Sequence, residues 1–224
     1  MNLKKIIVLG LLILTQSTEL FAQNFEWLKS FGSKKDSDYL YNIGSDDKVG
    51  VVFLNGFNSG IADTIQYDTF KVIKPKHDPF YCYVSADSQG KVRNVLPFVS
   101  NNRQSTFMAR DSSGNVYITT TFSGILKFDS AVYNSKKGNI LFLKYDRNLK
   151  LKWATQAGSD TLSFPMKLEY SYGHLYFNCI GRDTARFGTK TYILYFGNLI
   201  GEIHPTTGKI MWSSLVTTDI GPNI

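Results

Sequence analysis

Two stretches in the middle of the chain decide its fold: DSSGNVYITTTFSG, from Asp111 to Gly124, and NILFLKYDRNLKLKWATQAGS, from Asn139 to Ser159. Both are rich in Val, Ile, Thr, Tyr and Phe, which favour β-strands, and small polar residues punctuate the apolar runs. In this region the pattern predicts four short strands, at Thr106–Arg110, Asn115–Phe122, Asn139–Tyr145 and Leu151–Thr155. A group of four strands is therefore the expected structural unit.

The same unit recurs along the chain at a regular spacing. Tyr117 and Tyr176 are 59 positions apart, and so are Trp153 and Trp212. Three turn-like segments, each followed by a lysine, begin at the same spacing: Asp87–Gly90, Asp146–Leu149 and Pro205–Gly208. Repeats that cannot bury their apolar faces alone are expected to stack on their neighbours. No stretch after Ala22 shows a sustained apolar period of the helical kind, so we expect essentially no helix.

Repeats of four antiparallel strands are typical of β-propeller blades. We therefore predict an all-β fold of three four-stranded antiparallel repeats that form an open or incomplete ring. The predicted order is a signal peptide at 1–22, an orphan outer strand at 23–37, and blades at 38–101, 102–160 and 161–224. Three blades are fewer than the four to eight of a closed ring. We expect either a fragment of a longer propeller, which is the preferred interpretation, or an arc that associates with another copy.

Packing between neighbouring blades, rather than ligand contact, is the role we predict for Trp153 and Trp212. The connections between the second and third strands of each repeat are predicted to be loops and candidate contact surfaces: Asn58–Asp78, Ser123–Gly138 and Gly181–Lys190. The first of these connections is the most basic, with Lys71, Lys74, Lys76 and His77. A solvated loop without a partner is the preferred reading of that basic segment, and a contact surface is the alternative.

The middle repeat resembles the SBBP-type β-propeller repeat of secreted proteins from Bacteroidetes-like bacteria. That repeat joins an Asp-x-x-Gly-Asn turn and a Tyr strand to a Phe-x-Gly segment, a Lys-x-Asp turn and a Trp strand. The matching residues are Asp111, Gly114, Asn115, Tyr117, Phe122, Gly124, Phe128, Lys144, Asp146 and Trp153. The first repeat has Asn94 in place of the Trp, and the third lacks the first turn's Asp. The resemblance implies a propeller fold in an exported protein.

The beginning of the chain, Met1–Ala22, predicts an export signal. Lys4 and Lys5 precede an apolar run at Ile6–Thr15, and Ala22 is a small residue suited to a cleavage site. The apolar run is shorter than the ~20 residues that span a bilayer. We expect a secreted, periplasmic or cell-surface protein with no integral membrane segment after cleavage, and an uncleaved anchor is the alternative.

Charge and cysteine content argue against several classes of protein. The 224 residues carry 25 basic and 18 acidic side chains, but the basic ones form no stripe, so we expect no nucleic-acid partner. Two cysteines, Cys82 and Cys179, are too few for a disulfide-rich miniprotein or a four-cysteine zinc site. We expect two buried thiols, with a disulfide as the alternative.

No catalytic or metal site is predicted. The three histidines, His77, His174 and His204, lack metal-ligand spacing. Asp111–Asn115 is interpreted as a β-turn rather than a calcium loop, and Asp46–Asp47 as a solvated turn.

The segment GEIHPTTGKIMWSS, Gly201–Ser214, resembles the end of a quinoprotein propeller repeat. The matching residues are Thr207, Gly208, Lys209 and Trp212, which in that repeat form a turn and a packing Trp. No cysteine pair or calcium-ligand set accompanies them. We therefore predict a non-catalytic module without a cofactor, with a binding or scaffold role at the cell envelope or outside the cell. Its partner would be an unknown protein or glycan. The alternative is a propeller enzyme, either a quinoprotein-like oxidoreductase or a glycan-active hydrolase.

Overall fold

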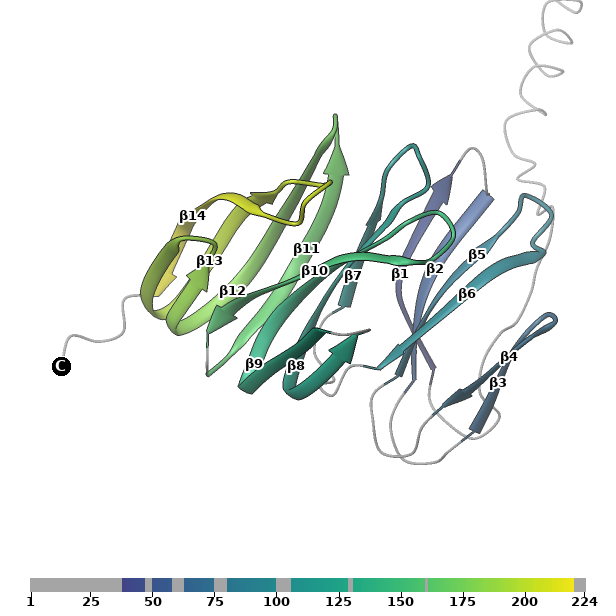
Figure 1. Cartoon of the computed structure of the whole chain (residues 1–224), viewed down its shortest axis with the longest axis horizontal. Coiled ribbons are helices and arrows are strands. Elements are labelled where there is room, and N and C mark those ends of the chain that lie inside the picture. The colour runs from purple at the N-terminus through teal and green to yellow at the C-terminus, as the bar shows by residue number, and fades with distance from the viewer. Residues whose placement is uncertain are drawn as a thin grey trace, which may run out of the picture. The chain divides into compact units, whose positions relative to one another are not determined.

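The computed structural model describes residues 38–46, 50–57, 63–74, 80–99, 106–128, 131–159 and 161–219. These residues form fourteen β-strands and no helix, which confirms the all-β prediction (Figure 1). Every strand pairing among them is antiparallel. The predicted signal peptide at 1–22 and the predicted outer strand at 23–37 lie outside the described residues.

The first sheet has four strands in the order β1–β2–β5–β6. Their bounds are Asp38–Asp46 for β1, Gly50–Phe57 for β2, Phe80–Ala86 for β5 and Val92–Val99 for β6. A separate hairpin, β3 (Asp63–Tyr67) and β4 (Phe70–Lys74), lies between β2 and β5 in the chain. Within Asn58–Asp78, the prediction of a loop was therefore wrong for the described part, 63–74, where two strands pair and bury Ile65, Tyr67 and Val72.

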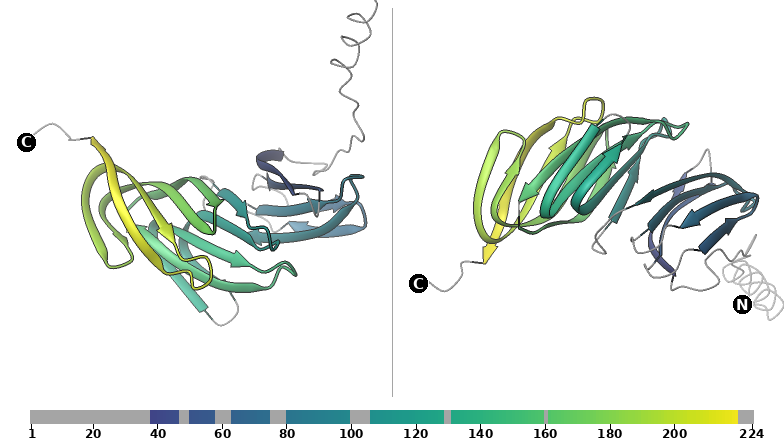
Figure 2. Two further views of the ribbon diagram at one scale, coloured as in Figure 1. Left: turned by 90° about the horizontal axis from the view of Figure 1, so that it is seen from above. Right: turned by 60° about the horizontal axis from the view of Figure 1, so that its bottom comes forward.

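The other eight strands form one continuous sheet made of two four-stranded groups. The first group, here called the middle sheet, contains β7 (Thr106–Arg110), β8 (Val116–Phe128), β9 (Ala131–Tyr145) and β10 (Leu151–Ser159). The second group, the third sheet, contains β11 (Ser163–Ser171), β12 (His174–Phe187), β13 (Lys190–Ile203) and β14 (Ile210–Asp219). The groups join where β10 pairs with β12 at Gly158–Arg186 and Ser159–Ala185. Both views of Figure 2 show β12 and β13 running side by side.

Two of the predicted loops are in fact parts of long hairpins. Strands β8 and β9 continue through most of Ser123–Gly138, and strand β12 continues through most of Gly181–Lys190. Each hairpin contains a register shift, between Phe122 and Gly124 in β8 and between Gly181 and Asp183 in β12. Gly124 has φ 77° and Asp183 has φ 55°. Pairing resumes after each irregularity, at Gly124–Ser135 in the first hairpin and at Asp183–Leu194 in the second, so these segments stay in the ladder.

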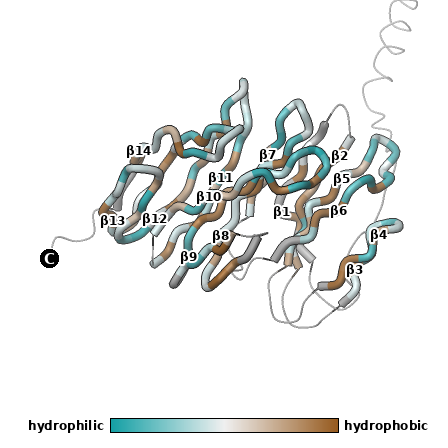
Figure 3. The backbone as a smooth tube through the Cα atoms, in the orientation of Figure 1, coloured by the Kyte–Doolittle hydropathy of each residue, from teal (hydrophilic) through white to brown (hydrophobic). Residues whose placement is uncertain are grey.

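Each face of the middle sheet packs on another sheet, and successive side chains of its strands contribute to one core or the other because they point to opposite faces. Val116, Ile118 and Leu143 belong to one core cluster with Leu54 and Tyr83 of the first sheet. The alternate residues of the same strands form a second cluster with the third sheet: Tyr117, Ile140 and Phe142 pack there with Leu175, Phe177 and Leu199. Figure 3 shows the corresponding changes of hydropathy along the strands.

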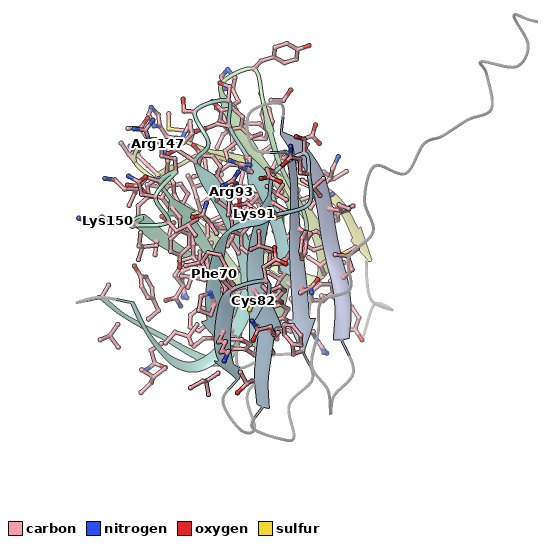
Figure 4. The ribbon with its side chains drawn as sticks, turned by 90° about the vertical axis from the view of Figure 1, so that its right-hand side faces the viewer. Phe70, Cys82, Lys91, Arg93, Arg147 and Lys150 are labelled. Atoms are coloured by element: carbon pink, nitrogen blue, oxygen red, sulfur yellow. The ribbon has the colours of Figure 1, made fainter. Side chains whose placement is uncertain are left out.

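The hairpin β3–β4 covers the opposite face of the first sheet. Ile65, Tyr67 and Val72 of the hairpin form a cluster with Phe53 and Cys82, and Phe70 packs against it. Figure 4 labels Phe70 and Cys82 on these two neighbouring elements. The first sheet is therefore enclosed by the hairpin on one face and by the middle sheet on the other.

Three aspartates shape turns in the same way. One carboxylate oxygen of Asp87, Asp111 or Asp146 accepts the backbone N–H groups of the residues two and four positions later, at 2.9–3.0 Å. These bonds confirm the β-turn interpretation of Asp111–Asn115, where the amide of Gly114 also donates to the carbonyl of Asp111. Figure 4 shows Arg147 and Lys150, beside the turn at Asp146, pointing outward.

The two cysteines are free and buried, as the preferred reading of the sequence predicted. Desolvation raises the pKa of Cys82 to about 12 and also raises the pKa of Cys179. Because the thiolate is the reactive form, we expect neither thiol to react with a disulfide reagent such as DTNB in the native protein at about pH 8. Both should react at once in denaturant, as followed by absorbance. Rapid reaction of either thiol without denaturant would contradict the buried positions.

Candidate functional site

A row of three large side chains crosses the middle sheet. Lys144 of β9 is paired with Tyr117 on β8 and with Trp153 on β10. The rings of Tyr117 and Trp153 have centroids 6.1 Å apart, and the Lys144 ammonium lies 5.2 Å from the Tyr117 ring centroid. Tyr170 of the third sheet stacks on Tyr117 at 5.6 Å, with 8° between the ring planes. We call Tyr117, Lys144 and Trp153 the Tyr117 row.

The turn between β13 and β14, His204–Lys209, lies over the Tyr117 row. The carbonyl oxygen of Pro205 accepts hydrogen bonds from Lys144 Nζ at 2.8 Å and from Trp153 Nε1 at 3.1 Å. Gly208 in this turn has φ 72°, and a Cβ on it would lie 2.7 Å from Trp153 Cδ2. Glycine permits both the left-handed backbone and this close approach. Trp153 thus packs between two sheets, as the sequence predicted.

The third sheet carries the equivalent row, with one change. Glu202 of β13 is paired with Tyr176 on β12 and with Trp212 on β14. These residues, the Tyr176 row, occupy the places of the Tyr117 row, but an acid replaces Lys144. Trp212 Nε1 donates to one carboxylate oxygen of Glu202 at 2.7 Å, and His174 Nδ1 lies 2.7 Å from the other. The His174 ring also stacks on Tyr176.

Among the described residues, no other sheet covers the Tyr176 row. Tyr176 is 38% exposed, Ile200 37% and Trp212 40%. A hollow of about 260 Å³ lies on this face. It is lined by Lys167, Glu169, Tyr176, Phe177, Asn178, Ile200, Gly201 and Trp212. We call this surface the open face.

The open face differs in its side chains from the buried face that it matches. Asn178 and Ile200 occupy the places of Thr119 and Phe142 on the middle sheet, as the strand pairing shows. At the rim, Lys167 pairs with Glu169 at 2.5 Å. Aromatic rings beside amide and charged groups suit a surface that is stable in water and still able to bind. The arrangement therefore fits reversible association better than a permanent core.

The carboxyl of Glu202 is held in its ionised form. The hydrogen bond from His174 makes the largest contribution to lowering its pKa below the usual range, and the hydrogen bond from Trp212 lowers it further. A carboxyl whose pKa is lowered on folding stabilises the fold at pH values above its pKa in the unfolded chain, about 4.3. This stabilisation is lost as the pH falls through the pKa of the folded protein.

We therefore expect Glu202→Gln to reduce the free energy of unfolding above about pH 4.3 and to match the parent protein in stronger acid. The effect should be small because solvent screens the interaction between Glu202 and His174. Urea unfolding curves at a series of pH values measure it, and His174→Ala should reproduce part of it. A difference that does not vary with pH would contradict this assignment.

The basic segment and the histidines do not form a site in the described residues. Lys71 is exposed on β4, Lys74 ends that strand, and Lys76 and His77 lie outside the described residues. His204 begins the β13–β14 turn, where its ring accepts the backbone N–H of Thr206. Asp46 ends β1, and Asp47 lies outside the described part.

No group of three or more His, Cys, Asp or Glu side chains in the described ranges could hold a metal ion. Those ranges also contain no helix long and apolar enough to cross a membrane.

Sequence reasoning missed the partnership of Glu202 with His174 and Trp212. The one signal was spacing: Tyr176 and Trp212 keep the period of the repeat, whereas Glu202 follows Lys144 one position too early to keep it. Strand pairing nevertheless aligns Glu202 with Lys144, because the third turn is one residue longer than the second.

No protein-family model matches this chain, and no curated protein matches it.

Proposed function

We propose that this protein is a secreted, non-catalytic binding module built from propeller-type repeats, and that the open face binds a partner protein. One observation carries the proposal. The Tyr176 row repeats the Tyr117 row, which in the middle sheet is the surface on which another sheet docks. In the third sheet the same surface is exposed.

The chemistry of the open face supports binding of a protein surface. On the middle sheet the equivalent place accepts an aromatic ring, Tyr170, and a turn with an outward carbonyl. A partner on the open face would fill the hollow with apolar side chains and bring hydrogen-bond donors to Glu202. Exposed Trp and Tyr side chains dominate the energy of many protein interfaces.

The export pattern of Met1–Ala22 and the resemblance to SBBP-type repeats support the remaining parts of this proposal. Three groups of four antiparallel strands follow one another in the chain, as successive blades would. Secretion to the cell surface would place the open face where envelope components can reach it.

Capture from a cell-envelope fraction tests the proposed binding. We expect the purified chain to retain one or more envelope proteins, and Trp212→Arg to lose at least about tenfold of that retention. Ile193→Arg is the matched control, because Ile193 is 89% exposed on β13 but does not line the hollow. Equal retention by all three proteins would place binding elsewhere and overturn the proposal.

Separate measurements test the two alternatives, a glycan ligand and catalytic activity. A glycan array probed with the parent chain and with Trp212→Arg would reveal a sugar ligand on the open face, and specific binding there would replace the protein partner. Reconstitution with a quinone and an electron acceptor, and assays on glycan substrates, test for catalysis. Turnover in either assay would overturn the non-catalytic reading.

A further inference from the structure

We propose that the open face pairs with the open face of a second copy of this chain, so that two third sheets stack about a two-fold axis. This inference rests on the proposed function, because it names the partner of the same surface. The repeat itself provides the precedent: this chain already buries the Tyr117 row by stacking one of its own sheets on another.

The outer face of the first sheet, at the other end of the chain's stacked sheets, explains why one open face should meet another open face. Head-to-tail association would place the open face of one copy on the outer face of the first sheet of the next. The hairpin β3–β4 already covers that outer face, where Ile65, Tyr67 and Val72 pack with Phe53. A contact that uses the same patch on both copies needs no second open sheet face, and it closes as a dimer.

The charges of the open face are suited to self-pairing. Lys167 supplies a positive charge, and Glu169 and Glu202 supply negative charges, all on the face that would be shared. In a two-fold contact each copy offers both signs, so that the ammonium of one copy can meet a carboxylate of the other. Ile200, Tyr176 and Trp212 supply the apolar surface that such a contact buries.

Sedimentation velocity from about 10 µM to about 1 mM protein tests the pairing. We expect the parent chain to shift from monomer to dimer over this range. Trp212→Arg should raise the dissociation constant at least about tenfold, because a buried cation would face apolar surface in the dimer. Tyr176→Arg is a second variant on the same face, and Ile193→Arg is the control that should dimerise like the parent.

Thermal melting by circular dichroism verifies that each variant is folded. A parent chain that stays monomeric throughout the range overturns the second-copy inference. Dimers that survive both arginine variants on the open face overturn it as well, and so do open-ended assemblies that grow beyond the dimer. Because envelope capture uses a different readout, a monomeric chain that still loses envelope retention in Trp212→Arg would leave the proposed function standing.

Discussion

Trp153→Ala is expected to lower the free energy of unfolding by about 3 kcal/mol, whereas Trp212→Ala should cost less than about 1 kcal/mol. The two tryptophans hold equivalent positions in successive sheets, and the substitution is the same. Only Trp153 is covered by another sheet, where its Nε1 donates to the carbonyl of Pro205.

Two separate losses make the Trp153 effect large. The indole leaves a cavity beside Tyr117 and against the backbone of Gly208. The carbonyl of Pro205 also loses one of its two donors and keeps only Lys144. Because Trp153 lies in the contact between the middle and third sheets, the loss is felt by both sheets.

Urea unfolding followed by far-ultraviolet circular dichroism measures both variants. The two variants are controls for each other, because each substitution removes one indole from a four-stranded sheet. Equal destabilisation of the two variants would mean that Trp212 is also covered in the folded protein. In that case the description of the open face as uncovered would be wrong.

Gly201→Ala is expected to destabilise the third sheet by about 1–3 kcal/mol, although it adds a single methyl group. A Cβ on Gly201 would lie 2.4 Å from Phe177 Cζ and 2.6 Å from the carbonyl oxygen of Trp212. Phe177 is buried between Phe142 and Phe187, with ring centroids at 5.2 and 5.6 Å, so its ring cannot move aside cheaply.

Gly44→Ala is the matched control for this substitution. Gly44 also lies within a strand, β1, but its added Cβ would meet only Val52 Cγ2, at an ordinary 3.5 Å. We expect the control to change the unfolding free energy by less than about 0.5 kcal/mol in the same urea experiment. A Gly201 variant as stable as the control would contradict the close packing of β13 on Phe177.

Much of the strand pattern could be predicted from local sequence. Thr106–Arg110 is β7 in the structure with the same bounds, because a short apolar run there ends at the strong turn signal of Asp111. The packing role of Trp153 was also predictable, since it recurs in a repeat whose units must stack. The same prediction was wrong for Trp212, which is 40% exposed because none of the described sheets lies over it.

The extent of the hairpins could not be predicted from these signals. β8 and β9 continue beyond Phe122 because their pairing resumes at Gly124 and Ser135 after a register shift. In the hairpin β3–β4 only alternate residues face the core. Its buried side chains pack against residues of β2 and β5. Such partners are far away in sequence, and local propensity does not report them.

The sequence by itself determined the all-β character, the repeated four-strand unit and the turns, since these depend on residues within a few positions of one another. Tertiary structure alone decided which repeated surface is covered. Tyr117 and Tyr176 sit in matching local sequence, yet Tyr117 is 1% exposed and Tyr176 is 38% exposed. The difference arises because burial depends on which sheet lies opposite, and the third sheet lies opposite Tyr117 but leaves Tyr176 on its outer face.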